Sequence, residues 1–127
     1  MNAHRILVAD DEEASRQGLK TLLSRWGYDV EEAATGKEAI RKAGSFRPDV
    51  VITDLVMPDG DGMELLTALQ AEVPFAMVIL LTGHGSIETA VSAMKQGAYD
   101  YLTKPVDMSR LKVLIEPLRG LPGRLSS

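Results

Sequence analysis

The chain contains no cysteine, which excludes a disulfide framework and a thiolate metal site. It also lacks any apolar run approaching ~18 residues, so no membrane span is expected. The N-terminal stretch "MNAHRILVADD" has neither the long apolar region nor the small-residue cleavage site of a secretory signal. These absences make the cytoplasm the expected location and a membrane partner unexpected.

Positive charge is not in excess either, because the net charge is −4, which argues against direct binding of nucleic acid by this domain. What is present is the composition of a globular protein, with 45% hydrophobic and 25% charged residues. A length of 127 residues suits one domain with a real core. We expect residues 1–118 to form that domain and residues 119–127 to be a tail or the start of a linker.

Short apolar runs rich in β-branched residues recur along the chain at a steady spacing. Five such runs predict strands: "RILVA" (5–9), "YDVEEA" (28–33), "DVVITD" (49–54), "MVILLT" (77–82) and "AYDYL" (98–102). The first, third and fourth are almost continuously apolar, which is typical of strands buried on both faces of a parallel sheet.

Segments with helical periodicity lie between these runs. Thr35 and Glu38 form a capping-box pattern, Gly27 follows one helical pattern as a stop signal, and Pro117 is expected to end the last helix. Asp61 and Ser86 are candidate N-caps. Five β-then-α units with right-handed crossovers predict an α/β fold, a five-stranded parallel doubly wound sheet with five helices on its two faces.

Polar residues follow the predicted strands at the same edge of this sheet. Asp10 and Asp11 follow the first strand, Asp54 ends the third, Thr82 ends the fourth, and Lys104 follows the fifth. Sites in doubly wound sheets form beyond the carboxyl ends of the strands. We therefore expect these five side chains to meet.

Three carboxylates gathered there would repel one another, by about 3 kcal/mol for each pair ~5 Å apart at an effective dielectric of ~20. A divalent cation relieves that repulsion, and oxygen ligands without His or Cys favour Mg²⁺ or Mn²⁺ over zinc. With Lys104 and Thr82, such a site matches the oxygens of a phosphoryl group in transfer. Asp54 is then the natural carboxylate nucleophile.

The sequence resembles the receiver domain of bacterial two-component response regulators over roughly residues 4 to 118. The resemblance rests on four motifs in their order and spacing: "VADDE" (8–12), "DLVMPDGDGMEL" (54–65), "LLTGHG" (80–85) and "DYLTKP" (100–105). Within the family the chain is most similar to receivers of nitrogen-regulation-type transcriptional activators, which work with an alternative sigma factor. The implied fold is flavodoxin-like, with strand order 2-1-3-4-5.

The resemblance also implies roles for particular residues. Asp54 would accept a phosphoryl group from a phosphohistidine of a sensor histidine kinase, and the cofactor would be Mg²⁺, with Mn²⁺ as a substitute. The implied metal ligands are Asp11, Asp54 and the backbone carbonyl of Val56, with Asp10 acting partly through water. Lys104 would hold the phosphate, before a cis-proline at Pro105. Thr82 would swing towards the phosphate, and Tyr101 would follow by changing rotamer.

The same resemblance implies a switch rather than an enzyme with turnover. Phosphorylation would reshape the face made by the fourth helix, fifth strand and fifth helix, near Ala98, Tyr99 and Tyr101, where an output domain or a second copy would dock. Val56 and His84 occupy positions that would tune hydrolysis of the phosphoryl group. Val56 cannot hydrogen-bond an attacking water, which predicts slow dephosphorylation.

Each site residue also has a plainer interpretation. Asp10 and Asp11 are suited to capping the first helix, Asp54 to opening a turn, Lys104 to the solvated surface and Thr82 to a strand end. Tyr101 is suited to half-burial against a helix. These interpretations require all five polar residues to reach the same sheet edge by accident.

Rival functions leave specific marks in a sequence. A haloacid dehalogenase-type phosphatase needs a second Asp two residues after the nucleophile, where this chain has Val56. A calcium loop built on "PDGDG" fails the EF-hand spacing, since Glu64 stands where glycine is needed. A nucleotide-binding fold lacks its Gly-rich turn after the first strand. A receiver-like domain that no longer takes phosphate and only binds partners is a further alternative, and the complete set of five polar residues argues against it.

Overall fold

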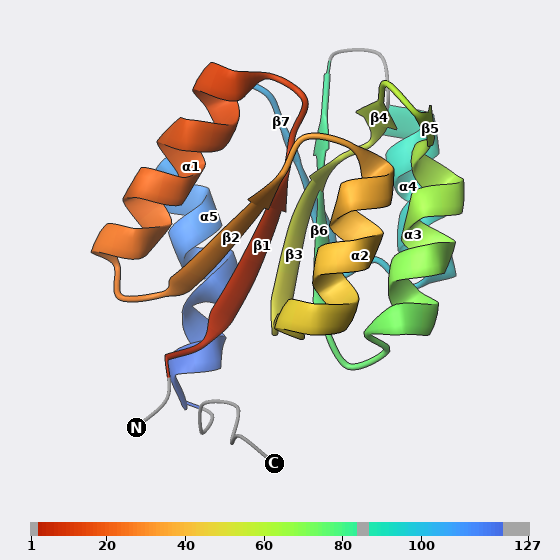
Figure 1. Cartoon of the computed structure of the whole chain (residues 1–127). Helices are drawn as coiled ribbons and strands as arrows, with labels where there is room; N and C mark the ends of the chain where they lie inside the picture. The colour runs from red at the N-terminus through yellow and green to blue at the C-terminus, as the bar shows by residue number, and fades with distance from the viewer. Residues whose placement is uncertain (1–2, 84–86, 121–127) are drawn as a thin grey trace.

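The computed structural model describes residues 3–83 and 87–120 and consists of alternating strands and helices (Figure 1). The predicted cap Ser86 and the predicted tuning residue His84 lie outside the described residues. In chain order the elements are β1 (Arg5–Ala9), α1 (Glu13–Arg25), β2 (Asp29–Ala33), α2 (Gly36–Phe46), β3 (Val50–Asp54), β4 (Val56–Met57), β5 (Gly60–Asp61), α3 (Gly62–Glu72), β6 (Met77–Thr82), α4 (Ile87–Gln96), β7 (Asp100–Thr103), α5 (Met108–Ile115) and the 3₁₀ helix η1 (Glu116–Gly120).

The main sheet has, within the described residues, five parallel strands in the order β2-β1-β3-β6-β7. Counted along the chain, these are the five predicted strands in the predicted order 2-1-3-4-5. β3 lies at the centre, with Val8 opposite Ile52 on one side and Asp54 opposite Leu81 on the other. All five residues of β3 are buried, as its continuous apolar run predicts.

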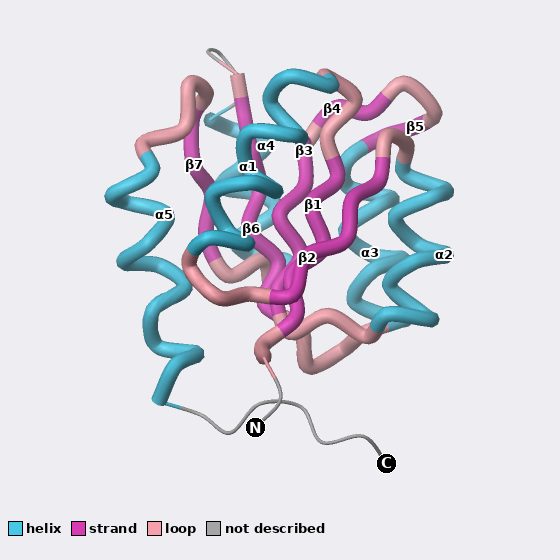
Figure 2. Tube along the Cα trace, turned by 60° about the vertical axis from the view of Figure 1, so that its left-hand side comes forward, coloured by secondary structure: helices cyan, strands magenta, loops and turns pink. Residues whose placement is uncertain are grey.

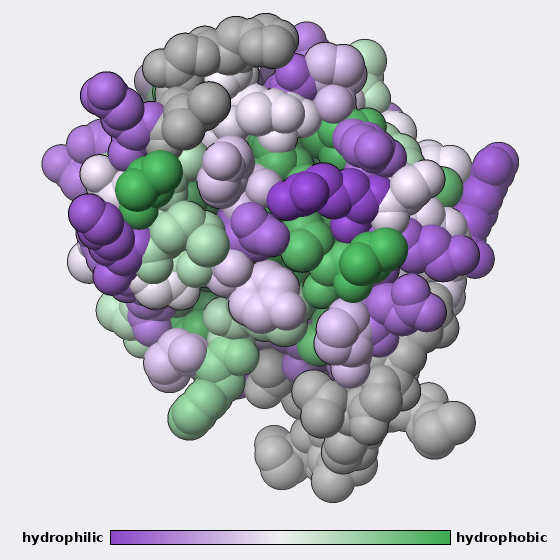
Figure 3. All heavy atoms as spheres, turned by 180° about the vertical axis from the view of Figure 1, so that it is seen from behind, coloured by the Kyte–Doolittle hydropathy of each residue, from purple (hydrophilic) through white to green (hydrophobic). Residues whose placement is uncertain are grey.

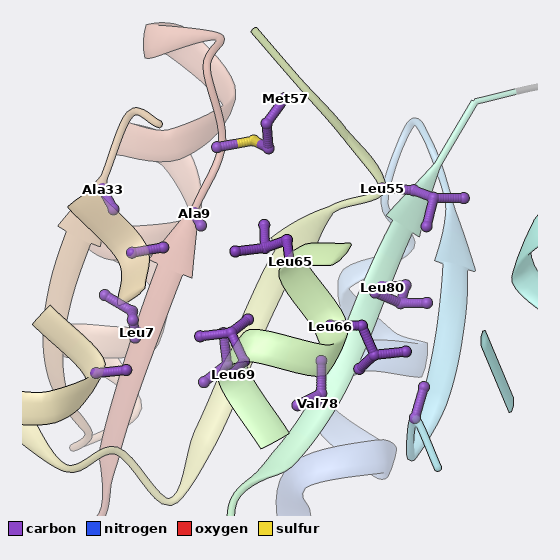
Figure 4. Close-up of a cluster of buried hydrophobic side chains, with 14 of the residues drawn as sticks. Leu7, Ala9, Ala33, Leu55, Met57, Leu65, Leu66, Leu69, Val78 and Leu80 are labelled. Carbon is purple, nitrogen blue, oxygen red and sulfur yellow. The ribbon is translucent and has the colours of Figure 1, made fainter. Parts of the chain in front are cut away.

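Helices cover both faces of the sheet (Figures 1 and 2). α1 and α5 cover one face, where Leu19, Leu23, Leu111 and Ile115 pack on alternate residues of β1, β3 and β6. α2, α3 and α4 cover the other face. Figure 4 shows Leu65, Leu66 and Leu69 of α3 directed at the sheet residues Leu7, Val78 and Leu80. The fold is therefore the predicted doubly wound α/β arrangement.

Local signals in the sequence fix several helix ends. The Glu38 amide donates to Thr35 Oγ1 (3.1 Å), and the Glu38 carboxylate accepts from the Ala34 amide (2.8 Å), which places the predicted capping box at the start of α2. Asp61 caps α3 by accepting from the Met63 amide. Gly27 follows α1 with φ = 96°, in the left-handed region where glycine carries no steric cost.

The structure differs from the sequence prediction mainly at element ends. β2 begins at Asp29 rather than Tyr28, and β7 spans Asp100–Thr103 rather than residues 98–102. α5 ends at Ile115, and the chain continues as the 3₁₀ helix η1, which contains Pro117. The antiparallel pair β4–β5 was not predicted, because two-residue strands leave no periodic signal. None of the described helices is long and apolar enough to cross a membrane.

Candidate functional site

The polar residues singled out in the sequence come together at the carboxyl ends of the central strands. Asp10 follows the last residue of β1, and Asp54 is the last residue of β3. Thr82 is the last residue of β6, and Lys104 follows the last residue of β7. Parallel strands end at one edge of a sheet, so residues far apart in the chain become neighbours there.

Three carboxylates form a tight cluster at this edge. One oxygen each of Asp10, Asp11 and Asp54 lies within 4.8 Å of the others. Asp10 is fully buried and Asp54 is 6% exposed, whereas Asp11 is exposed to solvent. Two of the three negative charges therefore sit where water screens them poorly, and the cluster needs positive charge or protons to be stable.

Lys104 supplies part of that positive charge. Its ammonium nitrogen lies 2.8 Å from Oδ1 of Asp54 and 3.1 Å from Oδ2 of Asp10. Burial opposes the charge of Lys104, but the hydrogen bonds with Asp54 and then Asp10 outweigh it and raise the pKa of the lysine. Lys104 is therefore held as a cation against both buried acids.

Part of the remaining repulsion can be relieved by a proton on Asp54. Burial first, and then the neighbouring Asp10, raise the pKa of Asp54 to about 7, against the partial opposition of Lys104. Burial would also raise the pKa of Asp10, but hydrogen bonds from Asp54, Ser15, the Glu12 amide and Lys104 prevail and lower it. Asp10 thus stays ionised, while Asp54 shares a proton with it near neutral pH.

Thr82 brings a hydroxyl to the same edge without a protein partner. The residue is 1% exposed, and its Oγ1 makes no hydrogen bond to the described part of the chain. A buried hydroxyl without a partner costs free energy, so such groups are rare and call for an explanation. At this edge the Thr82 hydroxyl is suited to donate a hydrogen bond to the oxygen of a ligand.

Above the carboxylates is an open cavity of about 360 Å³, lined by Asp11, Asp54, Val56, Gly83 and Lys104 among others. Val56, in β4, is 72% exposed and forms part of its rim, so a small group approaching Asp54 passes beside it. The cavity gives the Asp54 carboxylate access from solvent.

Two further predicted residues lie on β7 and just after it. Tyr101 is half-buried against the core formed by α2, α3 and α4, which agrees with its plainer interpretation, and its role as a switch stays a prediction. The peptide bond between Lys104 and Pro105 is cis. Of the residues predicted near the switch face, Ala98 is buried, so Tyr99 rather than Ala98 reaches the surface.

The plainer interpretation of Asp10 and Asp11 is only partly correct. Asp10 Oδ1 accepts a hydrogen bond from the Glu12 amide at the entrance to α1, 2.9 Å away. The N-cap itself is Glu12, whose side chain makes no cap hydrogen bond. Asp10 therefore shapes the loop before α1 with one oxygen and faces Lys104 with the other.

Sequence reasoning missed Asp59, whose role is structural. Its two carboxylate oxygens accept from the amides of Gly36 and Lys37 (2.8 and 2.9 Å), at the start of α2. These hydrogen bonds lower the pKa of Asp59. The "PDGDG" segment, which was considered above as a calcium loop, instead caps the start of α2 through Asp59. Among the described residues, Asp10, Asp11 and Asp54 form the one group of three acids close enough to share an ion.

The donor set at the sheet edge fits a hard divalent cation. Three carboxylates converge, no His side chain of the described residues takes part, the chain has no Cys, and one of the acids faces solvent. Mg²⁺ and Mn²⁺ prefer such oxygen ligands and retain bound water. Asp10, Asp11 and Asp54 are therefore suited to hold Mg²⁺ beside a lysine and an unpartnered hydroxyl.

Comparisons with known proteins agree with this geometry. The sequence pattern of the response regulator receiver domain matches residues 6–116. The chain is 38% identical to the response regulator protein PilR of Pseudomonas aeruginosa over 115 residues, which are 91% of this chain and 26% of PilR. It is 37% identical to the nitrogen assimilation regulatory protein NtrX of Azorhizobium caulinodans over 116 residues, 90% of this chain and 26% of NtrX.

Solved structures give the same result. A response regulator receiver domain from Clostridium thermocellum superposes with a TM-score of 0.85 at 40% identity, covering 90% of this chain and 92% of that one. The receiver domain of NtrX from Brucella abortus gives a TM-score of 0.84 at 34% identity, with 92% and 99% coverage. The chain spans about a quarter of the length of PilR and NtrX, so those relatives contain further segments.

Proposed function

Because the chain belongs to the family of response regulator receiver domains, we propose that it is a phosphorylation-controlled switch with Asp54 as phosphoacceptor. One observation carries the proposal: three carboxylates converge at the edge of the sheet while the Lys104 ammonium lies 2.8 Å from Asp54. The donor of the phosphoryl group is a phosphohistidine on a sensor histidine kinase. The domain catalyses its own modification and slow dephosphorylation, with no turnover of an external substrate.

The reaction is a displacement at phosphorus. An Asp54 carboxylate oxygen attacks the phosphorus, the bond from phosphorus to the imidazole nitrogen breaks, and the imidazole leaves with the electron pair and takes up a proton. Asp54 must be ionised to attack, so the proton that it shares with Asp10 has to leave. Lys104 favours the ionised form and offers its ammonium to a phosphoryl oxygen.

Asp10, Asp11 and Asp54 are the side chains that would hold Mg²⁺, together with the backbone carbonyl of Val56. The bound ion would supply positive charge to the phosphoryl oxygens and offset the repulsion among the three acids. Thr82 contributes the hydroxyl that has no partner among the described residues.

The phosphoryl group adds about −1.5 to −2 charges beside Lys104 and Thr82. Both residues close on it and draw in the segments that follow β6 and β7, with Tyr101 changing rotamer. The surface of α4, β7 and α5 changes shape as a result. Exposed apolar side chains are already present there, at Val91, Tyr99 and Val113, and Figure 3 shows apolar side chains between hydrophilic ones on the molecule's rear face.

We propose that this surface passes the signal to an output domain or a second copy of the chain. The names of its relatives, which include transcriptional regulatory proteins and the DNA-binding transcriptional regulator NtrC, support control of transcription. The family resemblance of the sequence motifs adds that this control works together with an alternative sigma factor. The receiver, residues 1–118, takes no direct part in binding nucleic acid or membrane. The location is the cytoplasm.

The test is phosphorylation by acetyl phosphate with Mg²⁺, followed by intact-mass measurement. The wild-type chain should gain about 80 Da, one phosphoryl group, and Asp54→Asn should gain none. Omission of Mg²⁺ should suppress the gain. An Asp54→Asn chain that takes up phosphate like the wild type would overturn the assignment of Asp54. Sustained turnover of small phosphate esters would show an enzyme instead of a switch.

A further inference from the structure

Arg16 connects the acidic cluster to a neighbouring strand through two hydrogen bonds. It lies in the first turns of α1, with 13% of its side chain exposed. Its Nη1 donates to the backbone carbonyl of Asp10 (2.8 Å), and its Nε donates to Oε1 of Glu32 in β2 (2.9 Å). One guanidinium thus bridges a side chain and the main chain next to the carboxylates.

Glu32 holds this guanidinium in place. It also accepts from Gln17 Nε2 (2.7 Å) and Lys20 Nζ (2.9 Å), so three side chains of α1 converge on one carboxylate. The hydrogen bonds from Arg16 and then Lys20 lower the pKa of Glu32, which keeps it ionised. Arg16 is therefore charge-paired and oriented, and its charge is neutralised next to the metal site.

The carbonyl that Arg16 holds belongs to the peptide bond between Asp10 and Asp11. The torsions on either side of this peptide plane, ψ of Asp10 and φ of Asp11, set the direction of the Asp11 side chain relative to the anchored Asp10. Asp10 is buried and anchored by its amide, which donates to the Ala33 carbonyl (3.0 Å), and by its carboxylate. Asp11 is exposed and has no such anchors of its own among the hydrogen bonds of the described residues.

We propose that Arg16 is a positioning residue for the metal site: by fixing the Asp10–Asp11 peptide plane it keeps the Asp11 carboxylate aimed at Asp54. The proposal rests on the proposed function, since it concerns the same carboxylate cluster. Hydrogen bonds that orient metal ligands typically change metal affinity ten- to a hundred-fold when they are removed. Arg16 contacts neither the ion nor the phosphoryl group and acts through the main chain.

The experiment is a Mg²⁺ titration of the full chain without phosphate donor. The binding is monitored by the NMR signals of the amides of residues 9–12 and 54–56. Arg16→Gln removes the bridge, and Arg16→Lys keeps the charge but replaces two donor nitrogens by one. Both should raise the Mg²⁺ dissociation constant about ten-fold. Glu32→Gln leaves Arg16 in place but weakens its orientation, and should give a smaller increase.

Lys20→Met is the matched control, because it removes another partner of Glu32 that makes no hydrogen bond or ion pair with Asp10 among the described residues. The Mg²⁺ dissociation constant of Lys20→Met should stay within about two-fold of the wild-type value. This should hold even if the urea concentration that half-unfolds Lys20→Met falls as far as that of Arg16→Lys. A folded Arg16→Lys chain with wild-type affinity would overturn the proposal, as would equal losses in Lys20→Met. If Arg16→Gln fails to fold, Arg16→Lys and Glu32→Gln decide the matter.

Failure of this inference can be told apart from failure of the proposed function. If the wild-type chain binds Mg²⁺ and takes one phosphoryl group on Asp54, but the Arg16 variants bind Mg²⁺ equally well, only the role of Arg16 is wrong. If the wild-type chain binds no Mg²⁺, both proposals fail.

Discussion

The ammonium of Lys104 lies 2.8 Å from Oδ1 of Asp54, so the proposed phosphoacceptor carries an ion pair before any cation binds. One lysine cannot neutralise three carboxylates, and the raised pKa of Asp54, about 7, lets a proton remove only part of the remaining negative charge near neutral pH. Repulsion among the carboxylates therefore destabilises the folded chain when no metal ion is bound. This repulsion should be measurable as a dependence of the free energy of unfolding on pH.

We expect the ion-free chain to lose stability as the pH rises from about 4 to about 7. The pKa of Asp54 is near 7 in the folded chain and near 3.8 when unfolded, so in this window the folded state binds more protons. Stability then falls with pH, by at most about 4 kcal/mol, since one pKa unit corresponds to about 1.4 kcal/mol. Urea unfolding at a series of pH values without Mg²⁺ measures the slope.

Asp54→Asn is the control for this slope, because it removes the titrating group but keeps the shape. It should flatten the curve between pH 4 and 7 and be more stable than wild type at pH 7. Millimolar Mg²⁺ should stabilise the wild type at pH 7 far more than the variant. A wild-type curve that rises through this window, or that parallels Asp54→Asn, would contradict the raised pKa of Asp54.

Two buried threonines on adjacent strands allow the cost of an unpartnered hydroxyl to be measured. Thr82 Oγ1 has no partner in the described part of the chain, whereas Thr53 Oγ1 donates to the Asp54 carbonyl (3.1 Å). Thr53→Val should cost about 1–2 kcal/mol, because it removes a made hydrogen bond. Thr82→Val should leave stability unchanged or raise it by up to about 1 kcal/mol. Urea denaturation of both variants gives the comparison.

The same Thr82→Val chain should fail in switching. With Mg²⁺ and beryllofluoride, a phosphoryl analogue, the wild type should show NMR shifts across residues 82–108, since Thr82 and Lys104 close on the added group. In Thr82→Val the shifts should shrink to the surroundings of Asp54. Equal responses in both chains, or a wild-type response confined to residues beside Asp54, would contradict the proposed coupling.

Most of the fold was predictable because the sheet leaves a strong local signal. Continuous β-branched runs such as residues 50–54 are buried on both faces, and the acids and lysine that follow such runs had to meet at one edge. The family resemblance added the strand order. The strands themselves, and the meeting of the acids with the lysine, needed only the periodicity of the chain and the rule that parallel strands end at the same edge of a sheet.

Interactions between distant segments were not predictable in the same way. Asp59 caps α2 from more than twenty residues away, and no spacing rule connects an acid in a turn to amides on another helix. No pattern in the sequence singled out Arg16, because its two partners lie on β2 and in the loop after β1. Tertiary packing alone brings these groups together.

Gly62, the first residue of α3, should tolerate no side chain. A Cβ atom there would overlap the carbonyl oxygen of Leu55, which is backbone and cannot move aside cheaply. Gly62→Ala should cost about 3 kcal/mol or prevent folding. Gly18 is the control: it lies on an exposed part of α1 with nothing within 4 Å of an added Cβ. Gly18→Ala should raise stability by about 0.5–1 kcal/mol in urea unfolding.

Val56 should set a long lifetime for the phosphoryl group on Asp54. Its side chain is 72% exposed at the rim of the cavity above Asp54 and offers no hydrogen bond to an attacking water. Val56→Asn adds an amide that can orient this water. A hydrogen bond worth about 1 kcal/mol in the transition state speeds hydrolysis roughly five-fold. Intact-mass measurements after removal of acetyl phosphate follow the decay.

Val113→Asn is the matched control, because Val113 is 68% exposed on α5, outside the lining of that cavity. Its phosphoryl group should decay at the wild-type rate, since the same change of side chain is made where no attacking water passes. A Val56→Asn chain that loses phosphate no faster than Val113→Asn would mean that the rim of the cavity does not control access of water to Asp54. The lifetime would then have to be set by groups deeper in the site, with Lys104 and Thr82 the nearest.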